Sequence, residues 1–121
     1  MANPAIHIEH LSSNVAQAKQ FYTSLFDWKV EDMPVPDGEP YQVVKSAEGP
    51  NIGFYVIPGN IQPSWLTYIR VDDIKASVAK ATQLGATIVE EIAEFGDYGW
   101  SSVIADPAGA VFAIWEYKGA H

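Results

Sequence analysis

Hydrophobic and polar residues follow one another in an order that predicts a strand, a helix and three further strands in the first half of the chain. Residues 6–11 alternate with a period of two, which is typical of a half-buried strand. Polar residues 12–14 can start a helix after it. The apolar stripe expected on that helix consists of Val15, Ala18, Tyr22 and Leu25. The strands expected next cover residues 28–33, 41–45 and 52–57, with a turn at 36–38.

The second half of the chain repeats this order. A strand is expected over 65–71, then a helix that Asp72 or Asp73 can cap and that Gly85 can end. The stripe of this helix consists of Ile74, Val78, Ala81 and Leu84. Strands are expected over 87–91, 100–105 and 111–117. An offset of 59 residues pairs Leu25 with Leu84 (84 − 25) and Tyr41 with Trp100, and an offset of 60 pairs Gly53 with Ala113 and Tyr55 with Trp115.

The repeat predicts the domain organisation. The 121 residues fit one domain, with a first module at about 6–57, a linker at 58–64 and a second module at about 65–117. Each module would offer a curved sheet with its helix on the outer face. The other face of the sheet would then be free to hold a small molecule.

Composition narrows the classes of function. The chain has no cysteine, which excludes disulfides and thiolate metal sites and suits the reducing cytoplasm. We see no signal peptide and no 18-residue apolar stretch, so we expect no membrane span. A net charge of −8 disfavours nucleic acid as a partner. An acidic surface usually serves solubility, and the alternative is attraction for a cationic ligand.

Three stretches resemble signatures of a known family. They are residues 21–28 (FYTSLFDW), residues 65–73 (WLTYIRVDD) and residues 99–112, which contain the run DPAGAVF. Together they resemble the vicinal oxygen chelate superfamily, which includes glyoxalase I, bleomycin resistance proteins, extradiol dioxygenases and methylmalonyl-CoA epimerase. Asp27 stands where a glycine is usual. The resemblance covers about residues 6–117 and implies an α+β fold, with two βαβββ modules paired into a cupped mixed β-sheet and helices on the outer face.

The resemblance also implies where a divalent metal would bind. The family's enzymes hold it on side chains from the first and last strand of each module, and the corresponding positions here are His7, Leu66, Gly53 and Ala113. Only His7 is a ligand type, whereas a catalytic metal needs about three protein ligands. Glu9 shares the strand face of His7, and Glu116 is expected on the opposite face from Ala113. We therefore predict no metal and no other cofactor, with a divalent metal near His7 as the less favoured case.

Histidine and aromatic residues supply the remaining candidate chemistry. His7 is a candidate general base that Glu9 would orient, and the alternative is a structural pair on a half-buried sheet. His10 lies on the other strand face and is expected to pack toward the helix. Core packing accounts for part of the aromatic residues, and the others can stack on a ligand. The predicted ligand-binding residues are Tyr41, Gly53, Tyr55, Trp65, Tyr68, Trp100, Ala113 and Trp115.

Three functions remain open from the sequence. The favoured one is a metal-free small-molecule-binding protein of the glyoxalase and bleomycin-resistance type, sequestering a drug-like or metabolic ligand. The second is a metal-dependent lyase, isomerase or dioxygenase of the same superfamily, and the third is a module that binds a protein partner. Whether the chain is an enzyme stays undecided at this stage. The family pattern also predicts a homodimer.

Overall fold

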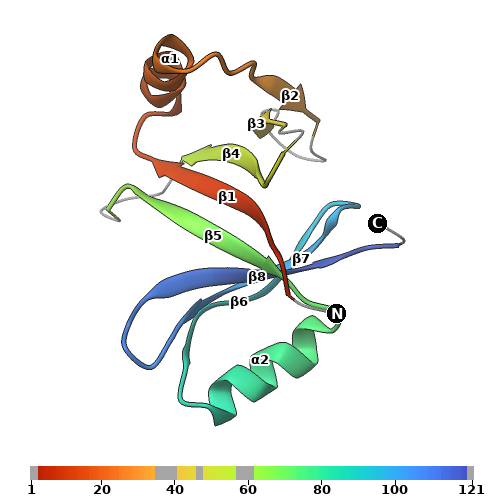
Figure 1. Cartoon of the computed structure of the whole chain (residues 1–121). Helices are drawn as coiled ribbons and strands as arrows, with labels where there is room; N and C mark the ends of the chain where they lie inside the picture. The colour runs from red at the N-terminus through yellow and green to blue at the C-terminus, as the bar shows by residue number, and fades with distance from the viewer. Residues whose placement is uncertain (1–2, 35–40, 46–47, 57–61, 120–121) are drawn as a thin grey trace. The chain divides into compact units, whose positions relative to one another are not determined.

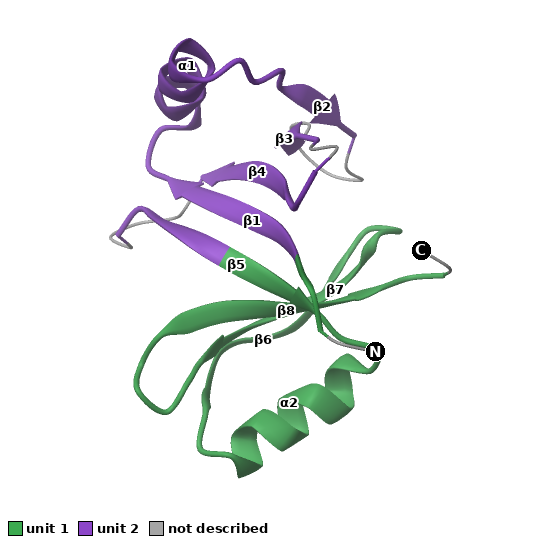
Figure 2. Ribbon diagram, in the orientation of Figure 1, with its two compact units in different colours: residues 1–5, 67–121 green, residues 6–66 purple. Residues whose placement is uncertain are grey.

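The computed structural model describes residues 3–34, 41–45, 48–56 and 62–119 (Figure 1). Two compact units divide the chain: unit 1 consists of Met1–Ala5 and Thr67–His121, and unit 2 is Ile6–Leu66 (Figure 2). The first five elements are β1 (Ala5–Ser12), α1 (Val15–Leu25), β2 (Glu31–Met33), β3 (Tyr41–Val44) and β4 (Asn51–Val56). The last five are β5 (Ser64–Arg70), α2 (Ile74–Gln83), β6 (Thr87–Phe95), β7 (Gly99–Ala105) and β8 (Val111–Tyr117).

Strands β2, β3, β4 and β1 lie side by side in unit 2. The β2–β3 and β3–β4 pairs are antiparallel, whereas β1 and β4 are parallel, with Glu9 opposite Gly53. Helix α1 covers one face of this sheet. Lys19 Nζ donates to Gln42 Oε1 at 2.6 Å, and the ring centroids of Tyr22 and Phe54 lie 6.2 Å apart. Residues that alternate with Gln42 and Phe54 therefore face away from α1.

The sheet of unit 1 has the same pattern, in the order β5, β8, β7, β6. Here β5 and β8 are parallel and the other pairs are antiparallel. Helix α2 packs on one face of this sheet, where Val71, Ile74, Ile104 and Ile114 form the buried core. Ile104 is only 1% exposed. The fold class is thus confirmed: each unit contributes one βαβββ module of an α+β fold.

Local capping chemistry explains where the helices begin and end. Asn14 Oδ1 accepts the N–H of Gln17 at 3.0 Å, and Asp73 Oδ1 accepts the N–H of Ala76 at 3.1 Å. Each side chain thereby satisfies one free donor in the first turn of its helix. Gly85 adopts φ 97° just after α2, a left-handed conformation that favours glycine. The predicted caps and stop are confirmed.

Several predicted details were wrong. Strand β2 begins at Glu31 rather than at residue 28, because Trp28 stacks on Tyr22 at 5.8 Å between ring centroids. Strand β6 continues to Phe95, with shifts of register on the way. The ends of both predicted helix stripes are exposed, Leu25 at 58% and Leu84 at 68%. The turn predicted at 36–38 and most of the linker predicted at 58–64 lie outside the described residues.

The predicted offset between the modules was also wrong in one strand. Val43 lies opposite Gly53 in unit 2, and Val103 lies opposite Ala113 in unit 1. The offset in these strands is therefore 60, and Tyr41 corresponds to Ser101 rather than to Trp100. A slip of one residue moves a side chain to the other face of a sheet.

Candidate functional site

His7, Glu9, Tyr41 and Gly53 lie on the face of the unit 2 sheet that points away from α1. Glu9 is the register partner of Gly53, which is also the partner of Val43. Alternation along β1 adds His7 to this face, and alternation along β3 adds Tyr41. Three strands therefore bring together four of the residues that the sequence singled out.

Three polar atoms converge at this place, and we call the residues the His7–Glu9–Tyr41 triad. His7 Nε2 lies 2.7 Å from Glu9 Oε1 and 2.8 Å from the Tyr41 hydroxyl. The Tyr41 hydroxyl donates a short hydrogen bond to the same Glu9 oxygen. A carboxylate only accepts hydrogen bonds, so His7 Nε2 carries the proton that it shares with Glu9.

Gly53 makes room for the triad. A Cβ atom at this position would lie 1.6 Å from the Tyr41 hydroxyl and 2.9 Å from His7 Nε2. Atoms cannot approach so closely, so any larger residue would displace the phenol. The glycine is needed for space, because Gly53 is not among the glycines with positive φ.

The charge of Glu9 is held in a largely buried place. Glu9 is 6% exposed, and its Oε1 atom receives both hydrogen bonds that the described residues give it. A buried carboxylate requires such donors, because removing it from water is costly. His7 and Tyr41 therefore compensate the burial of Glu9 while leaving the second oxygen, Oε2, without a donor among the described residues.

The positions that hold the metal in related enzymes do not fit a metal in this chain. Leu66 and Ala113 are buried apolar residues, and the space beside Gly53 is taken by the Tyr41 hydroxyl. His7 Nε2, the one donor of ligand type, is engaged with Glu9 and Tyr41. Within the described ranges there is no group of three or more His, Cys, Asp or Glu residues that could hold a metal ion.

His10 lies on the opposite face of β1 and packs toward α1, as expected. Its ring centroid lies 4.7 Å from that of Trp65, 5.3 Å from Tyr22 and 5.6 Å from Phe54. Nδ1 is buried without a hydrogen-bond partner. Desolvation lowers the pKa of His10, while its own backbone and the charge of Glu9 act in the opposite direction. This histidine belongs to the aromatic core between α1 and its sheet.

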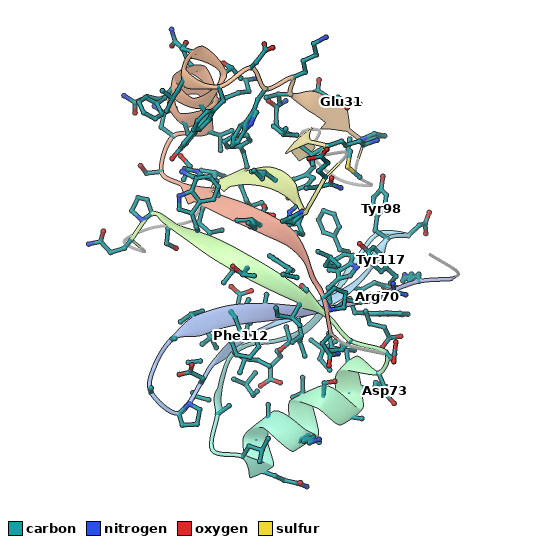
Figure 3. All side chains as sticks on the ribbon, in the orientation of Figure 1. Glu31, Arg70, Asp73, Tyr98, Phe112 and Tyr117 are labelled. Carbon is teal, nitrogen blue, oxygen red and sulfur yellow. The ribbon has the colours of Figure 1, made fainter. Side chains whose placement is uncertain are left out.

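Three of the predicted ligand-binding residues share the helix-free face of unit 1. Tyr68 is the register partner of Ala113, and Trp115 is the partner of Arg70. The ring of Trp115 lies 6.4 Å from that of Tyr68. Arg70 extends over the ring of Tyr117, 5.3 Å from its centroid (Figure 3). An aromatic surface is therefore present on this face, and its role in binding stays a prediction.

Trp65 and Trp100 lie apart from the other predicted ligand-binding residues, on the helix-covered face of their unit, and their role in binding stays a prediction. Leu66 takes the position equivalent to His7, so its neighbour Trp65 points to the opposite face of the strand. There the ring of Trp65 contacts His10 and Tyr22. Trp100 packs against the core beneath α2. Its register partner Glu116 accepts the N–H of Ile74 at 2.9 Å, which confirms the face expected for Glu116.

Sequence reasoning missed the polar partnership of Tyr41 with His7 and Glu9. Tyr41 appeared in the sequence only as an aromatic residue on a strand. The available signal was Gly53, because a glycine in a strand interior often marks the close approach of another group. Tyr55 is 52% exposed on the same strand face as Gly53, in keeping with its predicted place.

The two βαβββ modules, each with its helix on one face of its sheet, define a protein of the vicinal oxygen chelate class. Residues 6–115 match the glyoxalase-like domain, and the chain belongs to this family. Along the part of the chain that the structure describes, no helix is long and apolar enough to cross a membrane.

Similar proteins include "Putative glyoxylase CFP32" of Mycobacterium bovis, 34% identical over 110 residues that cover 87% of this chain and 42% of that protein. "Anthracycline biosynthesis protein DnrV" of Streptomyces peucetius is 28% identical over 120 residues, which cover 86% of this chain and 43% of that protein. The chain thus spans less than half the length of the curated relatives it matches. Methylmalonyl-CoA epimerase from Mycobacterium tuberculosis shares the fold, with a TM-score of 0.70 at 12% identity over 96% of this chain and 89% of that chain.

Proposed function

We propose that this chain binds a small molecule on the helix-free face of the unit 2 sheet and does so without the divalent metal of its enzymatic relatives. The observation that carries the proposal is the His7–Glu9–Tyr41 triad above Gly53. It is a preformed polar site on the helix-free face of its sheet, held by hydrogen bonds of 2.7 and 2.8 Å. Such a site can orient a ligand at no further cost in side-chain ordering.

The lack of fit to a metal supports binding ahead of metal chemistry. A metal at His7 would have to displace both Glu9 and Tyr41 from Nε2. It would gain no ligand from Leu66, Gly53 or Ala113, whose side chains carry no donor atom. The relatives are named for glyoxylase, anthracycline biosynthesis and epimerase functions, so the fold alone does not decide between binding and catalysis.

The alternative is a metal-dependent lyase, isomerase or dioxygenase, and it has one observation in its favour. His7 occupies a ligand position of the family and has Glu9 Oε1 2.7 Å away. Two ligands of N and O type are therefore adjacent. Metal analysis of protein purified without chelator, combined with thermal unfolding in the presence of Zn²⁺, Ni²⁺, Mn²⁺ or Fe²⁺, separates the two proposals.

We expect only traces of metal and no metal-dependent rise in the unfolding temperature. A stoichiometric metal that is lost in His7→Ala would establish the alternative instead. A thermal-shift screen of small molecules tests binding directly, with Tyr41→Phe as the variant that removes one polar atom of the site. A screen in which no compound stabilises the wild-type protein would count against a ligand site. We further propose a homodimer in the cytoplasm as the working form.

A further inference from the structure

We infer that the ligand of this face is a planar ring system that carries a hydrogen-bond donor, a hydroxyl or an amine, and that this donor binds Oε2 of Glu9. The inference rests on the proposed function and names the chemical class of its ligand. It follows from the hydrogen bonds that the triad has already used and from the surface beside it.

The triad has no donor left to offer a ligand at its centre. The Tyr41 hydroxyl proton is directed to Glu9 Oε1, and the proton on His7 Nε2 is shared with the same oxygen and with the phenol oxygen. Glu9 Oε2 accepts no hydrogen bond from the described residues, and it is not among the buried unpartnered side-chain atoms. What the site presents to a ligand is therefore an acceptor.

The strength of this acceptor comes from its charge and from the low exposure of its residue. Glu9 is 6% exposed, while its second oxygen stays open to solvent, since it is not among the buried unpartnered atoms. A hydrogen bond to an ionised group is shorter and stronger than a neutral one, and more so where water is excluded. A ligand hydroxyl or ammonium would satisfy Oε2, whereas an ether would leave it unsatisfied and a carboxylate would be repelled.

An exposed aromatic residue lies on the same sheet face, two residues along β4 from the register partner of Glu9. Tyr55 follows Gly53 by two residues on β4, so the two residues share a face about 7 Å apart along the strand. Tyr55 is 52% exposed, which leaves its ring available for stacking. A flat ligand lying on Tyr55 can reach Glu9 with a substituent at its edge.

The charge of the chain favours the same class. A net charge of −8 raises the local concentration of cations and lowers that of anions around the protein. Hydroxyl and ammonium donors satisfy the same oxygen, and the probes below distinguish them. Anionic ring systems are excluded by both the local and the overall charge.

Four probes with one ring system test the inference: 2-naphthol, 2-naphthylmethylammonium, 2-methoxynaphthalene and 2-naphthoate. Affinity is measured by NMR titration at neutral pH, with the site located by amide shifts on β1 and β4. We expect naphthol and the ammonium compound to bind at least about tenfold more tightly than the ether, since the ether covers a charged acceptor without pairing it. Naphthoate should bind most weakly.

Glu9→Gln provides the matched variant, because the amide keeps the shape of the side chain and removes its charge. We expect this variant to lose most of the preference for naphthol over the ether and to gain affinity for naphthoate. Glu91→Gln, at an exposed position of unit 1, removes the same charge elsewhere and should leave the wild-type order unchanged. A structural role of Glu9 alone would weaken all four probes equally.

The outcomes separate the inference from the proposed function. If the ether binds at β1 and β4 as tightly as naphthol, the face binds ligands but the donor requirement is wrong. If none of the four probes shifts these amides, the proposed function fails and the inference fails with it. The wild-type order of the four probes decides the matter even if Glu9→Gln does not fold.

Discussion

Substituting Gly53 by alanine tests the geometry of the candidate site most directly. The added Cβ would lie 1.6 Å from the Tyr41 hydroxyl and 2.4 Å from the ring carbon Cζ, whereas carbon and oxygen atoms normally stay about 3.5 Å apart. The phenol would have to move by about 2 Å, which exceeds what a hydrogen bond limited to about 3.2 Å can tolerate. The hydrogen bonds of Tyr41 to Glu9 and His7 would be lost.

The size of the effect follows from two opposing contributions. Hydrogen bonds to a charged group are worth about 1.5–3 kcal/mol, and their loss destabilises the folded state. Alanine in a strand interior is more stable than glycine by roughly 0.5–1 kcal/mol, because the unfolded glycine chain has more freedom. We therefore expect Gly53→Ala to lower the free energy of unfolding by about 1–2 kcal/mol.

The same substitution should have the opposite sign when the ring of Tyr41 is absent. In a Tyr41→Ala background the two closest atoms are gone, and His7 Nε2, 2.9 Å from the new Cβ, can yield by a small rotation of its side chain. Gly53→Ala should then stabilise by up to roughly 0.5–1 kcal/mol. Tyr41→Phe is an internal control: the hydroxyl is gone, but ring carbon Cζ still lies 2.4 Å from where the alanine Cβ would be, so the substitution should still destabilise. Urea unfolding followed by tryptophan fluorescence measures all three cases. An equal effect in every background would refute the close contact that defines the site.

Three further predictions concern other parts of the chain. Burial lowers the pKa of His10 below its ordinary value of 6.5, so the stabilising contribution of the neutral ring is complete above pH 6.5 and decreases as the pH falls below it. Between about pH 7.5 and 5.5, His10→Leu should therefore lose less stability in urea unfolding than the wild type does. An equal loss in both proteins would contradict the burial of this ring. Ile104→Ala should lower the free energy of unfolding by about 2–5 kcal/mol in urea titrations, because Ile104 is 1% exposed in the core beneath α2, and an effect well under 1 kcal/mol would contradict that packing. Phe21 is 59% exposed among the uncharged side chains of Gln17, Gln20 and Ser24 on α1, and we expect this surface to take part in the predicted homodimer. Phe21→Lys should then shift sedimentation toward one 13.3 kDa chain and Leu84→Lys should not, while a monomeric wild type would refute the dimer.

The elements of the fold could be predicted because their signals are local. The caps Asn14 and Asp73 act within three residues of their own position, and Gly85 ends α2 through its own backbone. The register between strands could not be predicted in this way, because it depends on pairing between residues that are distant in the sequence. This is why the offset that paired Tyr41 with Trp100 was wrong by one residue.

The candidate site could be predicted in part for the same reason. His7 and Glu9 are two residues apart on one strand, so alternation alone places them on one face. Tyr41 belongs to β3, and β4 lies between β3 and the strand of His7 and Glu9. Its position is fixed only by strand pairing, in which Gly53 of β4 lies opposite both Val43 and Glu9. No local pattern carries that information.

The two modules have the same strand order but different chemistry at equivalent positions. In unit 2 the helix-free face carries His7, Glu9, Tyr41 and Gly53; the equivalent residues of the second module are Leu66, Tyr68, Ser101 and Ala113. The second set contains no residue that is charged at neutral pH. A buried charge requires hydrogen bonds that compensate its loss of hydration. The module that buries Glu9 also supplies His7 and Tyr41 as its donors, whereas the second module has Tyr68 in place of the carboxylate. The repeated backbone thus explains the fold, while one module alone carries the polar chemistry from which a binding function can be argued.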